Sequence, residues 1–272
     1  MATQPRTRAA TGIIPAALTP MHDSGDANAA LLVEHCRRLL KQGCTSVLVL
    51  GTTGEANSFT LAERRTILES VLAGGLPPDK LIVGTGCCAV GDTVALTQHA
   101  LSVGVRRALI LPPFFYKNLS DEGLFRAFAT TIERIGDDRL RLFVYLIPQL
   151  TGIEMGADLI EKLHSAFPTV IAGLKDSSGN WPATEALCKR LGAKIDVLVG
   201  TEALLTQAMA AGASGCITAT GNVAAPLILR LYDERGDSDV DATERSVQSI
   251  RTAFEDVPLV PGLKAHLAQT SG

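Results

Sequence analysis

Several features that mark other classes of protein are missing from this sequence of 272 residues. Aromatic residues make up only 4% of it and charged residues 19%. No apolar run approaches the roughly 20 residues that would span a bilayer. The net charge of −3 gives no basic surface for nucleic acid and no polybasic segment for a lipid surface. These absences exclude nucleic-acid-binding and membrane proteins, and we expect a cytoplasmic protein.

The usual signatures of metal and dinucleotide sites are also missing. Six cysteines and five histidines are scattered along the chain without the spacing of zinc ligands. No G-x-G-x-x-G fingerprint follows the first apolar runs. Buried free thiols are more expected than disulfides in a chain of this size. We therefore expect no metal site.

The sequence does contain a regular alternation of two kinds of segment, and 46% of its residues are hydrophobic. Short β-branched runs that are apolar throughout are typical of parallel strands covered on both faces. Amphipathic helical segments stand between them, one of which opens with Thr60 and Glu63 at the spacing of a capping box. The expected strands are Ile13–Leu18, Thr45–Leu50, Leu81–Thr85, Ala108–Leu111, Leu142–Ile147, Val170–Leu174, Ile195–Val199 and Gly215–Thr218. The expected helices are Ala29–Gln42, Leu61–Ala73, Thr93–Val103, Glu122–Ile135, Ala157–Ala166, Thr184–Leu191, Glu202–Ala211, Val223–Asp233, Asp241–Phe254 and Gly262–Gln269.

Eight strands that are each followed by a helix predict an α/β protein of the (β/α)8 TIM-barrel type. An open doubly wound sheet is the alternative, because a strand count from sequence can be wrong by one. We place the barrel at residues 12–235 and a short C-terminal helical extension at residues 236–272. Residues 1–11 carry two arginines with no apolar segment behind them, so they read as a flexible lead and not as a signal peptide.

In a TIM barrel the catalytic residues lie at the carboxyl ends of the strands, because the loops that follow those ends form the active face. The sequence GTTGE, Gly51–Glu55, directly follows the second expected strand. Its glycines allow a tight turn with free N–H groups, and Thr52 and Thr53 add hydroxyls. The turn could therefore hold a carboxylate without an arginine. An ordinary strand-to-helix turn is the alternative.

Lys175 closes the sixth expected strand and Tyr145 closes the fifth, which is its neighbour in a barrel. A strand-end lysine points either to solvent or into the barrel mouth. Inside the mouth, desolvation would lower its pKa and supply the neutral amine that attacks a carbonyl. Strand alternation turns Asp176 the opposite way. Tyr145 could then carry protons for a carbinolamine, or it could be a buried structural tyrosine.

Two further segments carry weaker signals. Gly215–Asn222, at the end of the eighth expected strand, is rich in small residues that would leave room for a ligand. Pro112–Lys117, after the fourth, is aromatic in a chain with few aromatics. It could line the pocket or form a subunit contact, and the sequence does not decide between these roles.

Together these motifs resemble the dihydrodipicolinate synthase/N-acetylneuraminate lyase family. The matching elements, in order, are GTTGE at Gly51–Glu55, Y-x-I-P-x-x-T at Tyr145–Thr151 and G-L-K-D-S at Gly173–Ser177. The resemblance runs from Gly12 to Leu267, which is nearly the whole chain.

The resemblance implies a class I aldolase in which Lys175 forms an imine with C2 of pyruvate or another 2-oxo acid. Tyr145 would shuttle protons during imine formation and carbon–carbon bond chemistry. Thr52 and Thr53 would bind the carboxylate, with Thr52 also relaying protons, and main-chain groups near Ile217 would lie close to Lys175. The resemblance further implies no metal or organic cofactor and a homo-oligomer, either a dimer or a tetramer.

The sequence departs from the family at positions expected to meet the second substrate. In dihydrodipicolinate synthases the tyrosine segment reads Y-N-x-P-G-R-T, and its arginine grips the carboxylate of aspartate semialdehyde. Leu150 stands at that place here, and a leucine cannot donate to a carboxylate. A second family tyrosine corresponds to Phe115 or Tyr116. We therefore expect Gln149, Leu150 and Tyr116 to contact the variable part of the substrate.

We predict a pyruvate-dependent Schiff-base lyase or aldolase that cleaves or forms a 2-oxo acid, such as a 2-keto-3-deoxy sugar acid. One alternative is a 4-hydroxy-tetrahydrodipicolinate synthase, which joins pyruvate and aspartate semialdehyde in lysine biosynthesis. Another is a dehydratase or hydratase-aldolase acting on a sugar acid or an aromatic aldehyde. From a different class, a non-catalytic barrel could sense a small acid, but binding alone requires neither Lys175 nor Tyr145.

Overall fold

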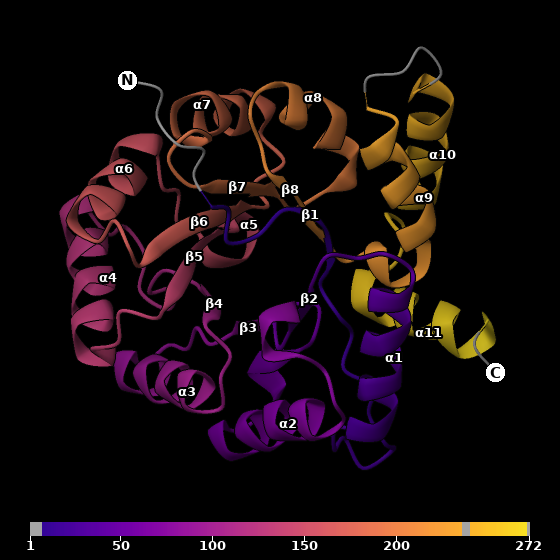
Figure 1. Ribbon diagram of the computed structural model, residues 1–272, viewed down its shortest axis with the longest axis horizontal. Coiled ribbons are helices and arrows are strands. Elements are labelled where there is room, and N and C mark those ends of the chain that lie inside the picture. Colours follow the sequence, from indigo (N-terminus) through magenta and orange to yellow (C-terminus); the bar gives the residue numbers. More distant parts are fainter. Residues whose placement is uncertain (1–6, 236–239, 271–272) are drawn as a thin grey trace.

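The computed structural model describes residues 7–235 and 240–270, and its centre is a barrel of eight parallel strands (Figure 1). The strands follow one another around the barrel in the order β1-β8-β7-β6-β5-β4-β3-β2. A bridge between Ala16 and Leu48, with the Ala17 N–H donating to the Leu48 carbonyl at 2.8 Å, joins β1 to β2 and closes the ring. The predicted (β/α)8 barrel is confirmed. The strands are β1 (Gly12–Pro15), β2 (Val47–Val49), β3 (Leu81–Gly84), β4 (Arg107–Ile110), β5 (Arg141–Leu146), β6 (Ile171–Asp176), β7 (Asp196–Val199) and β8 (Gly215–Thr218).

Helices surround the strands as an outer ring (Figure 1). The capping box predicted at Thr60 and Glu63 is present at the start of α2. A short helix, α5, was not expected; Pro148 starts it and Gly152, in the left-handed region, ends it. The helices are α1 (Ala29–Lys41), α2 (Leu61–Ala73), α3 (Val90–Ser102), α4 (Asp121–Ile135), α5 (Pro148–Thr151), α6 (Ala157–Ala166), α7 (Trp181–Leu191), α8 (Leu205–Ala210), α9 (Gly221–Asp233), α10 (Val240–Thr252) and α11 (Leu259–Thr270).

The hydrophobic core has two layers, as expected for strands that are apolar on both faces. One layer fills the barrel itself, where Phe143, Leu198 and Ile217 are fully buried among inward-facing neighbours. The other lies between the strands and the helices around them. This double burial holds the strand ends rigidly, so side chains that leave those ends have fixed positions.

Segments near both ends of the described part of the chain pack on the barrel. The N–H groups of Ala9 and Ala10 donate to the buried Asp196 carboxylate at 2.7 and 2.9 Å, so this part of the expected lead is held against the barrel. At the other end, α10 and α11 form the helical extension (Figure 1). The expected link 233–241 falls partly outside the described residues. No helix in the described part of the chain is long and apolar enough to cross a membrane.

Candidate active site

Lys175 and Tyr145 face each other at the carboxyl ends of two adjacent strands. The register of β5 and β6 pairs these two residues directly. The Lys175 Nζ donates to the Tyr145 hydroxyl at 3.3 Å and lies 4.4 Å from the centre of the tyrosine ring. The lysine is only 5% exposed and the tyrosine 4%. The structure therefore directs the lysine into the barrel mouth and not to solvent.

The residues around Lys175 explain this placement. Gly173, two positions earlier on the same strand, has no room for a side chain, because an added Cβ would lie 2.6 Å from the Phe143 ring. That ring fills the barrel interior. Asp176 turns the other way, as strand alternation predicts. Its carboxylate accepts from the Ser178 N–H at 2.9 Å and from the Thr184 hydroxyl at 2.5 Å, so it holds the loop after β6 against α7, whose N-cap is Asn180.

The phenol of Tyr145 has an unusual proton affinity. Burial alone would raise its pKa, but the positive charge of Lys175 acts in the opposite direction. Hydrogen bonds with Thr52, Lys175 and Ser177 also favour the phenolate, and the resulting pKa lies below the usual value for tyrosine. A phenol with a lowered pKa gives up and regains its proton more readily near neutral pH, as a proton carrier must.

The Gly51–Glu55 turn lies on the neighbouring wall of the barrel mouth. No carbonyl in the described ranges, 7–235 and 240–270, accepts a hydrogen bond from the main-chain N–H of Thr52 or of Thr53. The Thr19 hydroxyl holds the turn from behind by donating to the Gly54 carbonyl at 2.7 Å. Two adjacent N–H groups beside threonine hydroxyls are a suitable receptor for a carboxylate.

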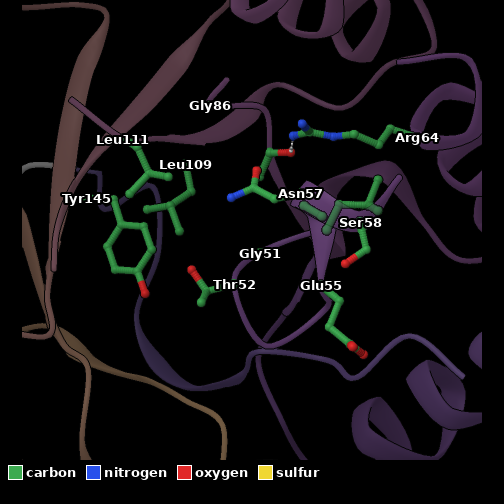
Figure 2. Close-up of a pocket in the computed structure, with 13 residues that line it drawn as sticks. Gly51, Thr52, Glu55, Asn57, Ser58, Arg64, Gly86, Leu109, Leu111 and Tyr145 are labelled. Atoms are coloured by element: carbon green, nitrogen blue, oxygen red, sulfur yellow. Dashed lines mark hydrogen bonds between the residues drawn. The ribbon is translucent and has the colours of Figure 1, made fainter. Parts of the chain in front are cut away.

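A cavity of about 250 Å³ connects the turn with Tyr145 (Figure 2). Figure 2 shows Tyr145 and Thr52 facing one another on one side, with Asn57 and Arg64 on the other. Leu109 and Leu111 supply an apolar wall; the cavity is also lined by Leu50, Gly51, Glu55, Ala56, Ser58, Gly84 and Gly86. Its size and its mixture of polar and apolar groups suit a small organic acid.

The residues expected to meet the second substrate lie on α5 and on the loop after β4. Gln149 donates through Nε2 to the carbonyls of Ser177 and Ser178 at 3.1 and 2.6 Å, which ties α5 to the segment after Lys175. Leu150 is 62% exposed. Tyr116 is 74% exposed and stacks edge-on against Phe115, outside the cavity lining. A single chain therefore does not bring Tyr116 to Tyr145.

The segment at the end of β8 contributes buried structure. Ile217 is fully buried in the same interior cluster as Tyr145. The Asn222 side chain is engaged by the backbone: its Nδ2 donates to the carbonyls of Ala16 and Ala219, both at 2.7 Å, and its Oδ1 accepts from the Leu18 N–H at 3.1 Å. We conclude that Asn222 holds β1 to β8 and does not present its amide to a ligand.

Arg64 is a cavity residue that the sequence analysis missed. Its guanidinium is buried and donates to the Gly84 carbonyl at 2.8 Å and toward the Cys87 sulfur at 3.1 Å. A signal was present, because Arg64 shares the inward face of α2 with Ile67, Leu68 and Val71 at helical spacing. A charged residue on an otherwise apolar helix face is rarely buried without a partner.

Comparison with known proteins agrees with this geometry. The model of the dihydrodipicolinate synthetase family matches residues 9–270. An uncharacterized DapA-like lyase of Chloroflexus aurantiacus is 35% identical over 264 residues, which cover 96% of this chain and 87% of that protein. The crystal structure of dihydrodipicolinate synthase from Agrobacterium tumefaciens superposes with a TM-score of 0.89 at 32% identity, covering 97% of this chain and 89% of the other.

A third likeness is to YagE of E. coli K12, a prophage protein of the dihydrodipicolinic acid synthase family whose crystal structure contains pyruvate. It has a TM-score of 0.85 at 25% identity and covers 93% of this chain and 86% of the other. A family match over nearly the whole chain, on the barrel that the strands form, means that this protein belongs to the dihydrodipicolinate synthetase family and is a lyase of the class I aldolase type.

Proposed function

We propose that this protein is a pyruvate-dependent Schiff-base aldolase that cleaves or forms a 2-oxo acid, of which a 2-keto-3-deoxy sugar acid is our leading candidate. The observation that carries the proposal is the buried contact of Lys175 with Tyr145 at 3.3 Å, beside a turn with two N–H groups that have no acceptor within residues 7–235 and 240–270. A sensor of small acids would need only the turn. The lysine and the acidified phenol add the means to make and break a covalent bond.

Imine formation begins when the neutral Lys175 amine attacks C2 of the 2-oxo acid, whose carboxylate binds the N–H groups of Thr52 and Thr53. Before this attack, the Tyr145 phenolate, whose fraction its lowered pKa increases, takes the proton of the Lys175 ammonium. After the attack, one proton passes from the nitrogen to the oxygen of the adduct. The resulting phenol then protonates the carbinolamine oxygen, and water leaves. One tyrosine thus serves as base and then as acid, with the Thr52 hydroxyl within its hydrogen-bond network.

Carbon–carbon cleavage follows from the positive charge of the iminium. The Tyr145 phenolate left by imine formation takes the proton of the C4 hydroxyl, the C3–C4 bond breaks and an aldehyde is released, while the bonding electrons move into an enamine on Lys175; the Tyr145 phenol is then the proton source for C3. Protonation of the enamine at C3 and hydrolysis by water release pyruvate and restore the amine. The reverse order of steps joins pyruvate to an aldehyde.

The residues at the outer end of the site, Gln149 and Leu150, indicate which class of aldehyde is the second substrate. Leu150 offers no charge to a carboxylated aldehyde, which argues against aspartate semialdehyde. Gln149 keeps an amide oxygen for a hydroxyl, since its Nε2 is occupied by the carbonyls of Ser177 and Ser178. This combination supports a hydroxylated, uncharged aldehyde. An apolar aldehyde beside Leu150 would instead fit the hydratase-aldolase alternative, whereas Leu146 packs between the strands and the helices.

A second candidate is a 4-hydroxy-tetrahydrodipicolinate synthase. It is favoured by the 32% identity to the synthase of Agrobacterium tumefaciens. A panel of aldehydes offered with pyruvate separates the two candidates, and efficient turnover of aspartate semialdehyde would reverse their order.

Oligomerisation and location complete the proposal. We expect a homodimer or a homotetramer, in which the exposed pair of Phe115 and Tyr116 contacts a second copy. Sedimentation analysis would test this.

A reducing compartment such as the cytoplasm suits the six cysteines, all of which are free thiols in the structure.

Borohydride reduction in the presence of pyruvate tests the central step. The imine should be reduced to a stable adduct, and mass spectrometry should locate it on Lys175. Lys175→Ala should form no adduct while keeping the circular dichroism spectrum of the parent. Lys162→Ala, which removes a lysine far from the barrel mouth, is the matched control. An unmodified Lys175 in the parent protein would refute the Schiff-base mechanism.

A further inference from the structure

The C-terminal helix α11 packs against the carboxyl end of the barrel, where the proposed chemistry takes place. Its residue Leu263 is fully buried in a small cluster with Leu18 and Ala219. Leu18 follows β1 and Ala219 follows β8, so the helix rests on the ends of two adjacent strands. Figure 1 shows α11 beside α1 and α9, outside the ring of barrel helices. Its position brings a residue far along the chain next to the active-site loops.

Lys264, the residue after this anchor, reaches the carboxylate-binding turn. Its ammonium forms an ion pair with the Glu55 carboxylate, and both side chains are partly exposed. Figure 2 shows the Glu55 carboxylate directed away from Tyr145. Glu55 therefore turns toward α11 and not toward the reacting groups.

The turn has a backbone that needs support from its surroundings. Leu50, just before it, and Glu55, its last residue, have φ values of 54° and 53°. L-residues with side chains rarely adopt this left-handed region, and such conformations persist only where neighbouring contacts impose them. The Thr19 hydroxyl holds the turn at Gly54. The ion pair with Lys264 holds it at Glu55.

We infer that Lys264 is a positioning residue: through Glu55, it keeps the Gly51–Glu55 turn in the conformation that presents the Thr52 and Thr53 N–H groups to the substrate carboxylate. This inference rests on the proposed function, because it assigns the turn to carboxylate binding. Loss of the ion pair weakens binding of the 2-oxo acid. It leaves the bond-making step at Lys175 unchanged, since neither partner touches the lysine or Tyr145.

The test measures how borohydride trapping on Lys175 depends on pyruvate concentration. Lys264→Met removes the charge but keeps the apolar stem, and Glu55→Gln removes the opposite charge. Each should raise the pyruvate concentration for half-maximal trapping about three- to tenfold, the range expected for one charged hydrogen bond at a partly exposed site. In Lys264→Met, trapping at saturating pyruvate should match the parent. Lys264→Arg should restore half-saturation to near the parent value.

Two further variants separate positioning from general stability. The charge-swapped pair Glu55→Lys with Lys264→Glu should bind pyruvate more tightly than either single substitution. Lys162→Met breaks an ion pair of similar kind with Glu122, between α4 and α6, and should leave half-saturation unchanged. Unchanged half-saturation in both Lys264→Met and Glu55→Gln overturns the inference. The inference is also overturned if trapping at saturating pyruvate falls in these variants in parallel with a lowered unfolding temperature.

Failure of the proposed function gives a different result from failure of this inference. If the parent protein forms no adduct at any pyruvate concentration, the Schiff-base function is wrong and the role of Lys264 falls with it. If the parent forms the adduct and the variants titrate like it, only the role of Lys264 is wrong.

Discussion

At the amino-terminal end of the barrel, the buried Asp196 carboxylate accepts hydrogen bonds from the N–H groups of Ala9 and Ala10. At the carboxyl end, the Thr52 and Thr53 N–H groups meet no acceptor among the described residues. The first end satisfies its polar groups within the chain. The second leaves donors for a ligand, and the free energy of making those hydrogen bonds is available only when the ligand binds.

The two ends should therefore respond differently to substitution. Removing a polar group at the amino-terminal end leaves buried partners unsatisfied and lowers stability. Removing one at the carboxyl end lowers activity with little loss of stability, because its partner is the substrate. This division matches the general separation of stability and catalysis between the two faces of such barrels.

The largest effect is expected for Tyr145→Phe. The ring still fills the barrel, but Lys175 loses its proton carrier, so kcat should fall about 10²- to 10⁴-fold. The unfolding temperature should change little. Steady-state turnover of pyruvate with an aldehyde is the measurement, and Tyr232→Phe on α9 is the matched control. Near-normal turnover in Tyr145→Phe would remove the tyrosine from the mechanism.

Asp196→Ala should show the opposite response. The N–H groups of Ala9 and Ala10 lose their acceptor, and the free energy of unfolding should fall by about 2–4 kcal/mol. Denaturant unfolding measures this loss. The exposed Asp158→Ala should remain within about 0.5 kcal/mol of the parent. The pyruvate concentration at half-saturation should be unchanged in the folded protein. A rise in that concentration would contradict the separation of stability and activity between the two ends of the barrel.

The smallest effect is expected at the rim of the carboxyl end. Leu150→Arg places a guanidinium where the family's synthases carry one, and kcat/KM for aspartate semialdehyde should rise about tenfold, the range of one charged hydrogen bond. Stability should not change, because Leu150 is 62% exposed. The same substitution at Leu31, an exposed leucine on α1, should not alter kcat/KM. If kcat/KM for aspartate semialdehyde does not rise in Leu150→Arg, the residue at position 150 does not contact the aldehyde.

Much of this arrangement follows from local sequence pattern. Continuous apolar runs predicted all eight strands, and the spacing of Thr60 and Glu63 predicted the capping box that the structure confirms. Because adjacent strands of a barrel bring their ends together, the same pattern placed Lys175 next to Tyr145. It did not predict α5, a single turn too short to show any periodicity.

By itself, the sequence determined the barrel, the strand ends and the chemical pair that they carry, because hydrophobic periodicity is a property of neighbouring residues. Only the tertiary structure decided which distant groups reach the turn and the cavity beside it. Arg64 reaches it because α2 packs with that residue inward, and Lys264 reaches Glu55 because Leu263 anchors α11 on β1 and β8. The contact of Lys264 with Glu55 depends on how the closed barrel brings β1 and β8 together, and no local pattern encodes that.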